Sequence, residues 1–286
     1  RPYRWRHGGT VSISEQVGAP MPEPPSSTGA PVLVLPDPNS WDPTQEPLPT
    51  PAMQELASRA AAALGAVAVF GAPVARAASL RRAHARVLAL HDAIVADGPL
   101  TAGQDVAPLN PIQIYFRLRR AAMTRRDAAA HATRTLMLAT ADLHLAPMSG
   151  SDLERSCVAM QQVIHDLFML GQVPGRGGTA ADPTPDQAVA SASEYAGALD
   201  VEAMWSMRWV VGHQLHALFN VMAAVAVDRA VAEFRGGLPQ SAVGNLKRAT
   251  VYVEGFPAAR AQSLAVPAEF YNLVLRPSML PPLVPA

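Results

Sequence analysis

The sequence predicts an all-α fold, with a single multi-helix domain preceded by a proline-rich N-terminal arm. From Pro51 onward, alanine, leucine, arginine and glutamine recur at helical spacing, and runs of β-branched residues are scarce. Strands do not alternate with helical segments, which argues against a doubly wound sheet or a barrel. Hydrophobic residues make up 49% of the 286 residues, so the chain has enough apolar surface to bury a sizeable core.

Residues 1–50 differ in composition from the rest of the chain. They hold 11 of the 27 prolines, and proline lacks an amide donor and disfavours both helix and sheet. We therefore expect an extended or partly disordered arm over 1–50 and a helical domain over 51–286. Within the arm, the apolar run 31–36 is typical of a β-strand, but the sequence offers it no evident partner.

Hydrophobic spacing and capping residues delimit the expected helices. The starts are marked by Pro51, by Pro73, by Ser149 or Ser151, and by Asp200. We expect helices over 51–70, 73–97, 110–123, 125–146, 150–171, 200–235 and 240–256, with a short one over 267–275. A Gly/Pro-rich stretch from 171 to 186 predicts a long loop, either a lid or a plain linker.

The charge balance and the single cysteine exclude several classes of protein. Lysine and arginine number 23, as do aspartate and glutamate, so no net field attracts nucleic acid or an anionic membrane. Cys157 alone can form neither an internal disulfide nor a zinc cluster, which fits a reducing, cytoplasmic location. The N-terminal residues lack the apolar segment of a signal peptide. Assembly into a homo-oligomer stays open.

The helix expected over 200–235 carries the strongest functional signal. Its most apolar part, 210–227, includes two histidines and so favours a buried core helix over a membrane span. A buried imidazole needs a hydrogen-bonding partner for each ring nitrogen or must coordinate something. Six residues fall close to one face at 3.6 residues per turn: Trp205, Trp209, Gly212, His213, His216 and Asn220.

This face has the composition expected of a heme pocket. Gly212 removes a side chain where a flat group could approach, and the tryptophans could form a wall for a large aromatic ligand. The pattern suits an iron porphyrin held by one imidazole, and both His213 and His216 fit that position. The alternative is that both are ordinary core histidines. His91, which follows an apolar turn and precedes Asp92, is the candidate for an acid/base on the opposite side of the metal.

Two segments resemble a known family. The run from Met204 to His216 and the later run from Phe270 to Pro282 are similar to the histidine-ligated heme-dependent aromatic oxygenases. These include the tryptophan and indoleamine dioxygenases and the bacterial heme-dependent tyrosine hydroxylases of natural-product pathways, among them antibiotic biosynthesis. The length and the all-helical pattern look most like the tyrosine hydroxylase branch. The resemblance covers roughly residues 51–282.

The resemblance implies heme b with His213 as the iron ligand, and Trp209, Gly212 and His216 around the cofactor. It implies an aromatic amino-acid substrate, tyrosine or a derivative, hydroxylated with peroxide or dioxygen. A substrate carboxylate needs a cation, and arginine provides bidentate pairing. We expect substrate contacts from Arg117, Asn220 and Arg276. Some members attach heme through His-x-x-x-Cys, but here Leu153 stands four positions before Cys157, so covalent attachment is not expected.

Three other functions stay open on the sequence. A tryptophan-type heme dioxygenase is the first, although its Gly-rich loop follows the proximal histidine whereas 175–178 precedes His213. The second is a metal-dependent phosphohydrolase, because His91-Asp92 and His165-Asp166 are His-Asp dipeptides on expected helices. The third is a non-catalytic helical binding protein with both histidines in its core. A ferritin-like di-iron site is disfavoured, because no Glu-x-x-His pair occurs.

Overall fold

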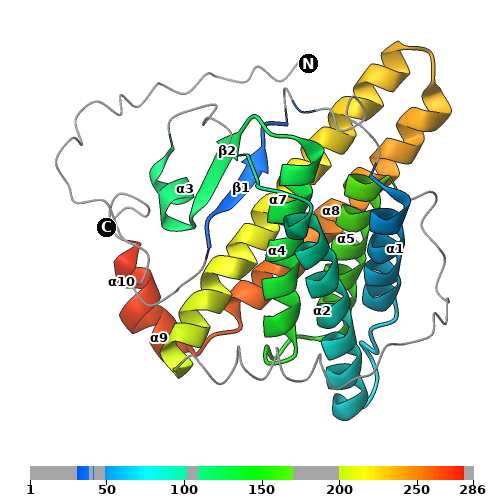
Figure 1. The fold of residues 1–286 in the computed structure, drawn as a ribbon. Helices are drawn as coiled ribbons and strands as arrows, with labels where there is room; N and C mark the ends of the chain where they lie inside the picture. Colours follow the sequence, from blue (N-terminus) through cyan, green and yellow to red (C-terminus); the bar gives the residue numbers. More distant parts are fainter. Residues whose placement is uncertain (1–30, 39–40, 42–48, 102–108, 170–199, 280–286) are drawn as a thin grey trace, which may run out of the picture.

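The computed structural model of the chain describes residues 31–38, 41, 49–101, 109–169 and 200–279. Most of the predicted N-terminal arm and the predicted Gly/Pro-rich loop lie outside the described residues. The described part is predominantly helical, which confirms the all-α prediction (Figure 1). Its only strands form one short two-stranded sheet.

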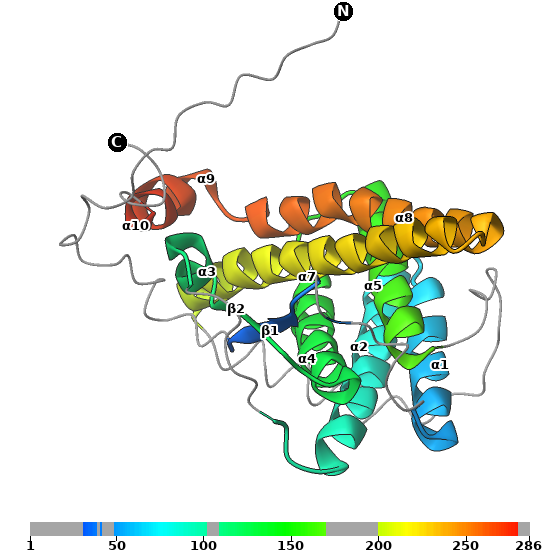
Figure 2. The same cartoon turned by 90° about the horizontal axis from the view of Figure 1, so that it is seen from above.

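The helices form two layers (Figure 2). One layer holds α1 (Pro51–Gly65), α2 (Pro73–Ala96), α4 (Arg125–Leu143) and α5 (Gly150–Phe168). The other is a long antiparallel hairpin of α7 (Val201–Arg235) and α8 (Pro239–Leu264), which lies across the first layer. Except for α8, each of these helices lies within the range predicted from the sequence.

The predicted caps close the helix starts. The Ser149 hydroxyl accepts a hydrogen bond from the Asp152 amide at the start of α5, and the Asp200 carboxylate accepts one from the Ala203 amide at the start of α7. Pro51 and Pro73 each occupy the first turn of a helix, where no amide donor is required.

The predicted helix over 110–123 is wrong beyond its first turn. Only α3 (Pro111–Tyr115) is helical, and Arg117 then takes a left-handed conformation with φ 53°. The chain continues as β2 (Leu118–Ala121), which pairs in parallel with β1 (Leu33–Pro36). The run 31–36 thus has a partner that the sequence did not reveal. Pairing with a distant strand supplies the backbone hydrogen bonds that a helix would otherwise supply locally, so tertiary structure overrides the helical pattern.

Gln214 of α7 holds this sheet against the hairpin. Its side-chain amide donates to the carbonyl of Pro31 at 2.9 Å and to that of Phe116 at 3.1 Å. One buried side chain therefore fixes the residues just before both strands. Because Phe116 immediately precedes Arg117 and β2, this contact also fixes where the Phe116 ring lies relative to α7.

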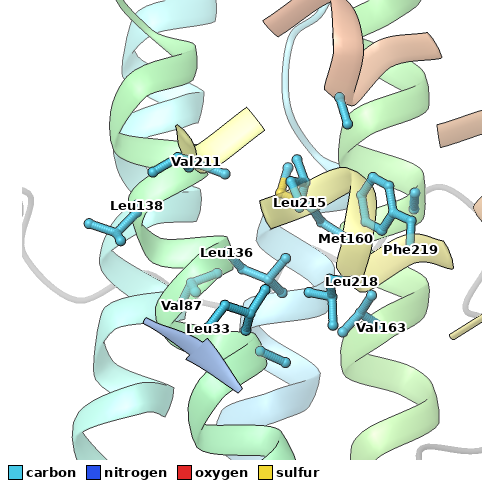
Figure 3. Packing of buried hydrophobic residues seen from close by; sticks show 14 of the residues in the cluster. Leu33, Val87, Leu136, Leu138, Met160, Val163, Val211, Leu215, Leu218 and Phe219 are labelled. Carbon is cyan, nitrogen blue, oxygen red and sulfur yellow. The ribbon is translucent and has the colours of Figure 1, made fainter. Parts of the chain in front are cut away.

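The core lies where α7 meets α4, α5 and β1. Figure 3 shows Leu215, Leu218 and Phe219 of α7 beside Met160 and Val163 of α5, with Leu33 of β1 close by. α7 is long and apolar enough to span a membrane, but 67% of its most apolar window is buried inside the fold. That burial is what a core helix shows, as the sequence predicted.

A buried ion pair joins the two layers. Arg208 of α7 donates from Nε to the Asp142 carboxylate of α4 at 2.9 and 3.1 Å, and both side chains are buried. Gln262 of α8 donates to the same carboxylate at 3.0 Å. α8 therefore continues to Leu264 through Pro257, beyond its predicted end at 256, because its last turns are held by α4 and α7.

The C-terminal segment differs from the single short helix predicted over 267–275. It consists of α9 (Ala268–Phe270), a π-helical turn (Tyr271–Leu275) and α10 (Arg276–Ser278). Such π turns are rare and are often found at functional sites. This segment packs on the N-terminal half of α7 together with α3 (Figures 1 and 2).

Candidate functional site

His213 is the centre of an aromatic cluster on α7. Its Nδ1 lies 2.7 Å from the Trp209 carbonyl oxygen one turn earlier. A carbonyl only accepts, so Nδ1 carries the proton, and in the neutral ring Nε2 then has the free lone pair. The pKa of His213 is lowered to about 4, mainly by burial and in smaller part by His216 and Arg260, while the hydrogen bond to the Trp209 carbonyl opposes the shift. The imidazole is therefore neutral at pH 7.

Two aromatic rings hold this imidazole in place. The Phe116 ring stacks on it with centroids 4.0 Å apart and planes 10° apart, and the Trp209 ring lies 4.3 Å away. Among the described residues, no hydrogen bond engages Nε2 of His213. The rings of Phe116 and Trp209 hold the imidazole in one orientation, and Nε2 on its edge stays available to bind a ligand.

The aromatic cluster extends to the C-terminal segment. Tyr271, at the start of the π turn, packs edge-on against Trp209 with centroids 5.7 Å apart. Trp205 contacts Phe270 at 5.2 Å. Both tryptophans thus pack against aromatic side chains of the C-terminal segment, and their role as walls for a bound ligand stays a prediction.

Tyr115 provides a hydroxyl beside these rings. Its OH lies 2.7 Å from the Ser278 hydroxyl, which itself donates to the Leu275 carbonyl at 2.7 Å. Ser278 can therefore only accept from Tyr115 in this arrangement. Burial raises the pKa of Tyr115, and the hydrogen bond to Ser278 partly offsets that rise. This contact connects α3 to α10 across the cluster.

His216 lies on the α8 side of the same helix. Its ring is 4.9 Å from the Phe256 ring of α8. Burial and the charge of Arg260 both lower the pKa of His216. Arg260, an exposed residue of α8, therefore acts on both histidines. The sequence pattern did not point to Arg260, because the predicted helix ended at residue 256 and nothing then placed the following residues beside α7.

Gly212 does not provide space for a flat group, so that part of the prediction is wrong. A Cβ there would lie 2.6 Å from Ser263 Cβ and 2.8 Å from the Ser263 backbone. The glycine instead allows α8 to approach α7 closely. Asn220, two turns beyond His213, is exposed to solvent.

The remaining predicted residues are spread over other elements. His91 of α2 contacts Thr133 of α4, with Nδ1 3.2 Å from the hydroxyl. Burial lowers its pKa, with Asp92 raising it and Arg134 lowering it. None of the contacts described for His91 involves the His213 cluster. Arg117 directly follows Phe116 and is half-buried, whereas Arg276 is exposed at the start of α10.

The His165-Asp166 dipeptide does not form a metal site in the described part of the chain. Asp166 accepts hydrogen bonds from the Tyr252 hydroxyl at 2.8 Å and from Gln162 at 2.9 Å, and Arg248 lies 3.7 Å away. No group of three or more His, Cys, Asp or Glu side chains suited to a metal occurs among the described residues. Cys157 is buried, and burial raises the pKa of its thiol to about 12, so it is not a nucleophile at neutral pH.

A cavity of about 420 Å³ lies away from this cluster, where the ends of α1, α2, α4 and α5 meet. Met53, Ile94, Arg125 and Phe168 are among its lining residues. No residue of the His213 cluster lines it, so the cavity and the cluster are separate features of the fold.

Fold and site together define a class of protein. It is a helical protein in which the neutral imidazole of His213 is oriented by a backbone carbonyl and packed between aromatic rings. A single such imidazole is how proteins commonly hold heme iron, and a carbonyl on the other ring nitrogen is the usual orienting contact. The donor chemistry at His213 therefore fits heme.

The comparison with protein families agrees with this class. Residues 35–286 match the model of the SfmD 3-methyl-L-tyrosine peroxygenase family, and the chain belongs to that family. No curated protein and no solved structure matches the chain. Membership confirms the predicted oxidoreductase class, one that modifies a tyrosine derivative. The relationship to tryptophan and indoleamine dioxygenases stays a prediction.

Proposed function

We propose that this chain hydroxylates the aromatic ring of a tyrosine derivative such as 3-methyl-L-tyrosine, with peroxide as oxygen donor and heme b bound at His213. The observation that carries the proposal is the neutral His213 ring, whose Nδ1 is engaged by Trp209 while Nε2 keeps its lone pair. Family membership supplies the substrate class and the oxidant. When bound, heme supplies the iron chemistry that activates peroxide.

The chain's own residues have distinct tasks in this proposal. His213 holds iron through Nε2, and the Trp209 carbonyl fixes the tautomer and raises the basicity of that nitrogen. Phe116 prevents the imidazole from turning. Arg260 provides a cation for a carboxylate, either of the cofactor or of the amino-acid substrate. His216 is the second candidate ligand.

Hemin titration of the purified chain tests the cofactor. We expect a Soret band that saturates at one hemin per chain and shifts on reduction and on adding cyanide. His213→Ala should lose this band, while His216→Ala, its matched control on the same helix, should keep it. Equal heme uptake by wild type and His213→Ala would reject the ligand assignment, and the opposite pattern would transfer the role to His216.

Turnover of the heme-loaded chain tests the reaction. With 3-methyl-L-tyrosine and hydrogen peroxide we expect a product one oxygen atom heavier, identified by mass spectrometry. Dioxygen with a reductant replaces peroxide in a parallel reaction, and tyrosine replaces the methylated substrate in another. A heme-loaded protein that converts none of these would reject the proposed reaction while leaving heme binding intact.

The acid/base role proposed for His91 has its own test. His91→Phe should retain heme and lose most turnover if the imidazole moves a proton during the reaction. Unchanged turnover would reject the acid/base role and leave His91 with a structural role only, through its contact with Thr133. The cytoplasmic location and the place of the reaction in a bacterial natural-product pathway stay predictions.

A further inference from the structure

The free end of the α7–α8 hairpin exposes a strip of large apolar side chains. Their exposed fractions lie between 40% and 71%, far above those of core residues. We call this set the tip strip: Val227, Val231, Phe234, Leu238, Val243, Leu246 and Val253. Several large apolar side chains exposed at one end of a molecule often mark an interaction surface.

The strip has the spacing of a helix–helix interface. On α7 its members follow at steps of four and three residues, from Val227 to Phe234, and Leu238 lies beyond the turn, at the N-cap of α8. On α8 they follow at steps of three and seven, from Val243 to Val253. These are the a/d intervals by which helices pack side by side in bundles. Each helix of the hairpin therefore offers a seam to another helix.

The other end of the same face of α7 is already covered. Trp209 and His213, which lie on this face at helical spacing from Val227, contact Tyr271 and Phe116. Figures 1 and 2 show α3, α9 and α10 at that end, whereas the tip of the hairpin projects from the opposite end. A partner that covers the strip must therefore approach from the tip.

We propose that the tip strip binds a second copy of this chain, with the two hairpins antiparallel about a two-fold axis near Val231. Asp228 and Arg235 are exposed, seven residues apart, on one rim of the seam and on either side of Val231. The two-fold rotation places Asp228 opposite Arg235 of the partner subunit, and this ion pair forms twice. The strip is thus complementary to itself in charge as well as in apolar pattern.

The exposed residues of α8 also pair with their counterparts in the partner subunit about the same two-fold axis. A Cβ at Gly212 would lie 2.6 Å from Ser263 Cβ, and in an antiparallel hairpin this close approach places Val231 level with about residue 244 of α8. Gln240 and Lys247 are exposed, seven residues apart, and lie on either side of that level. The rotation brings Lys247 to Gln240 of the partner subunit, an ammonium donor to an amide acceptor. No like charges meet.

The mixed charges of the rim also argue for a protein partner over a membrane surface. An anionic membrane would favour a rim of lysine and arginine alone. Here Asp228 alternates with Arg235 along α7, and Glu254 follows Lys247 along α8. Two copies of this chain can pair these charges, whereas a lipid surface would leave the carboxylates repelled.

Light scattering after size exclusion tests the proposal on the full chain. We expect the wild type to have twice the 30.2 kDa mass of one chain. Val231→Glu places two carboxylates at the axis and should weaken the dimer at least about 100-fold, giving the monomer mass. Val74→Glu, at a 79% exposed valine on α2, is the matched control and should stay dimeric.

A charge exchange tests the register. Asp228→Arg and Arg235→Asp should each weaken the dimer, because each places like charges opposite one another. The double variant should restore it, because the ion pair forms again in the reverse sense. If the double variant is as weak as the single ones, the register is rejected.

A disulfide provides an independent readout. Cys157 is buried, so Val231→Cys adds the one accessible thiol of the described residues, and oxidation should link two chains. A wild type that stays monomeric at high concentration overturns the proposal. A dimer that survives Val231→Glu and gives no linkage overturns it as well, since the strip is then covered by another segment of the chain or by a different partner. Circular dichroism checks that each variant folds.

Discussion

The imidazole of His213 lies flat against the phenyl ring of Phe116, with centroids 4.0 Å apart and planes 10° apart. The two residues are almost one hundred positions apart in the chain, and Gln214, next to His213, donates to the Phe116 carbonyl. The irregular turn before β2 is therefore what orients the candidate heme ligand. The orientation of His213 therefore depends on the turn that contains Phe116, although this turn carries no catalytic motif.

Acid should destabilise the heme-free chain. Burial lowers the pKa of His213 and of His131 to about 4, against an ordinary value of 6.5. The unfolded chain binds more protons between these two values, so the free energy of unfolding should fall as the pH falls from about 6.5 to 4, by up to about 3 kcal/mol for each histidine.

Urea unfolding at several pH values across this window measures the effect. His131→Gln should make the unfolding free energy depend less steeply on pH, because the unfolded chain then takes up at most one proton fewer than the wild type does. The unfolding free energy near pH 7.5 should change less. A stability that rises on acidification would contradict the neutral, buried histidines described by the structure.

Gly212→Ala should destabilise the protein although alanine is the better helix former. The added Cβ meets the Ser263 backbone at 2.8 Å, and backbone cannot move aside as a flexible side chain can. We expect a loss of about 2–3 kcal/mol. Gly244→Ala on α8 is the control, since no atom lies within 4 Å of its Cβ, and it should stabilise by about 0.5–1 kcal/mol. Equal effects in denaturant unfolding would refute the close approach of α7 and α8.

Removing the Tyr115 hydroxyl should loosen the C-terminal segment. Tyr115→Phe and Ser278→Ala each remove one side of the 2.7 Å hydrogen bond, and each should cost about 0.5–1.5 kcal/mol. In a double-mutant cycle the two losses should not add, because the second substitution removes a bond that is already absent. Hydrogen exchange should rise in α9 and α10 in all three variants. Additive losses would show that the two hydroxyls do not interact.

Breaking the Arg208–Asp142 pair should be far more costly than breaking a surface pair. Arg208→Met leaves the Asp142 carboxylate buried without its counter-charge and should cost about 3–5 kcal/mol. Arg155→Met removes the exposed pair with Asp152 and should change stability by less than about 1 kcal/mol. Thermal and urea unfolding compare the two. Similar costs would mean that water reaches the Asp142 carboxylate.

Local chemistry predicted the helices well. Ser149 and Asp200 each accept a hydrogen bond from an amide three residues further on, and Pro51 and Pro73 occupy first-turn positions that need no amide donor. These signals depend only on residues that are close together in the sequence, so they need no distant partner. His213 could also be recognised from the sequence, because an ionisable side chain is uncommon within so apolar a stretch.

The sequence by itself determined the all-α class, the starts of the main helices and the choice of α7 as the helix bearing the candidate ligand. Only the tertiary structure decided that residues 118–121 are a strand, that Gly212 faces Ser263, that Phe116 stacks on His213, and that the charge of Arg260 lowers the pKa of His213. The physical reason is the range of the interactions. Caps and helical periodicity act within one or two turns, whereas strand pairing, close helix approach and ring stacking join residues far apart in the chain and appear only when the layers pack.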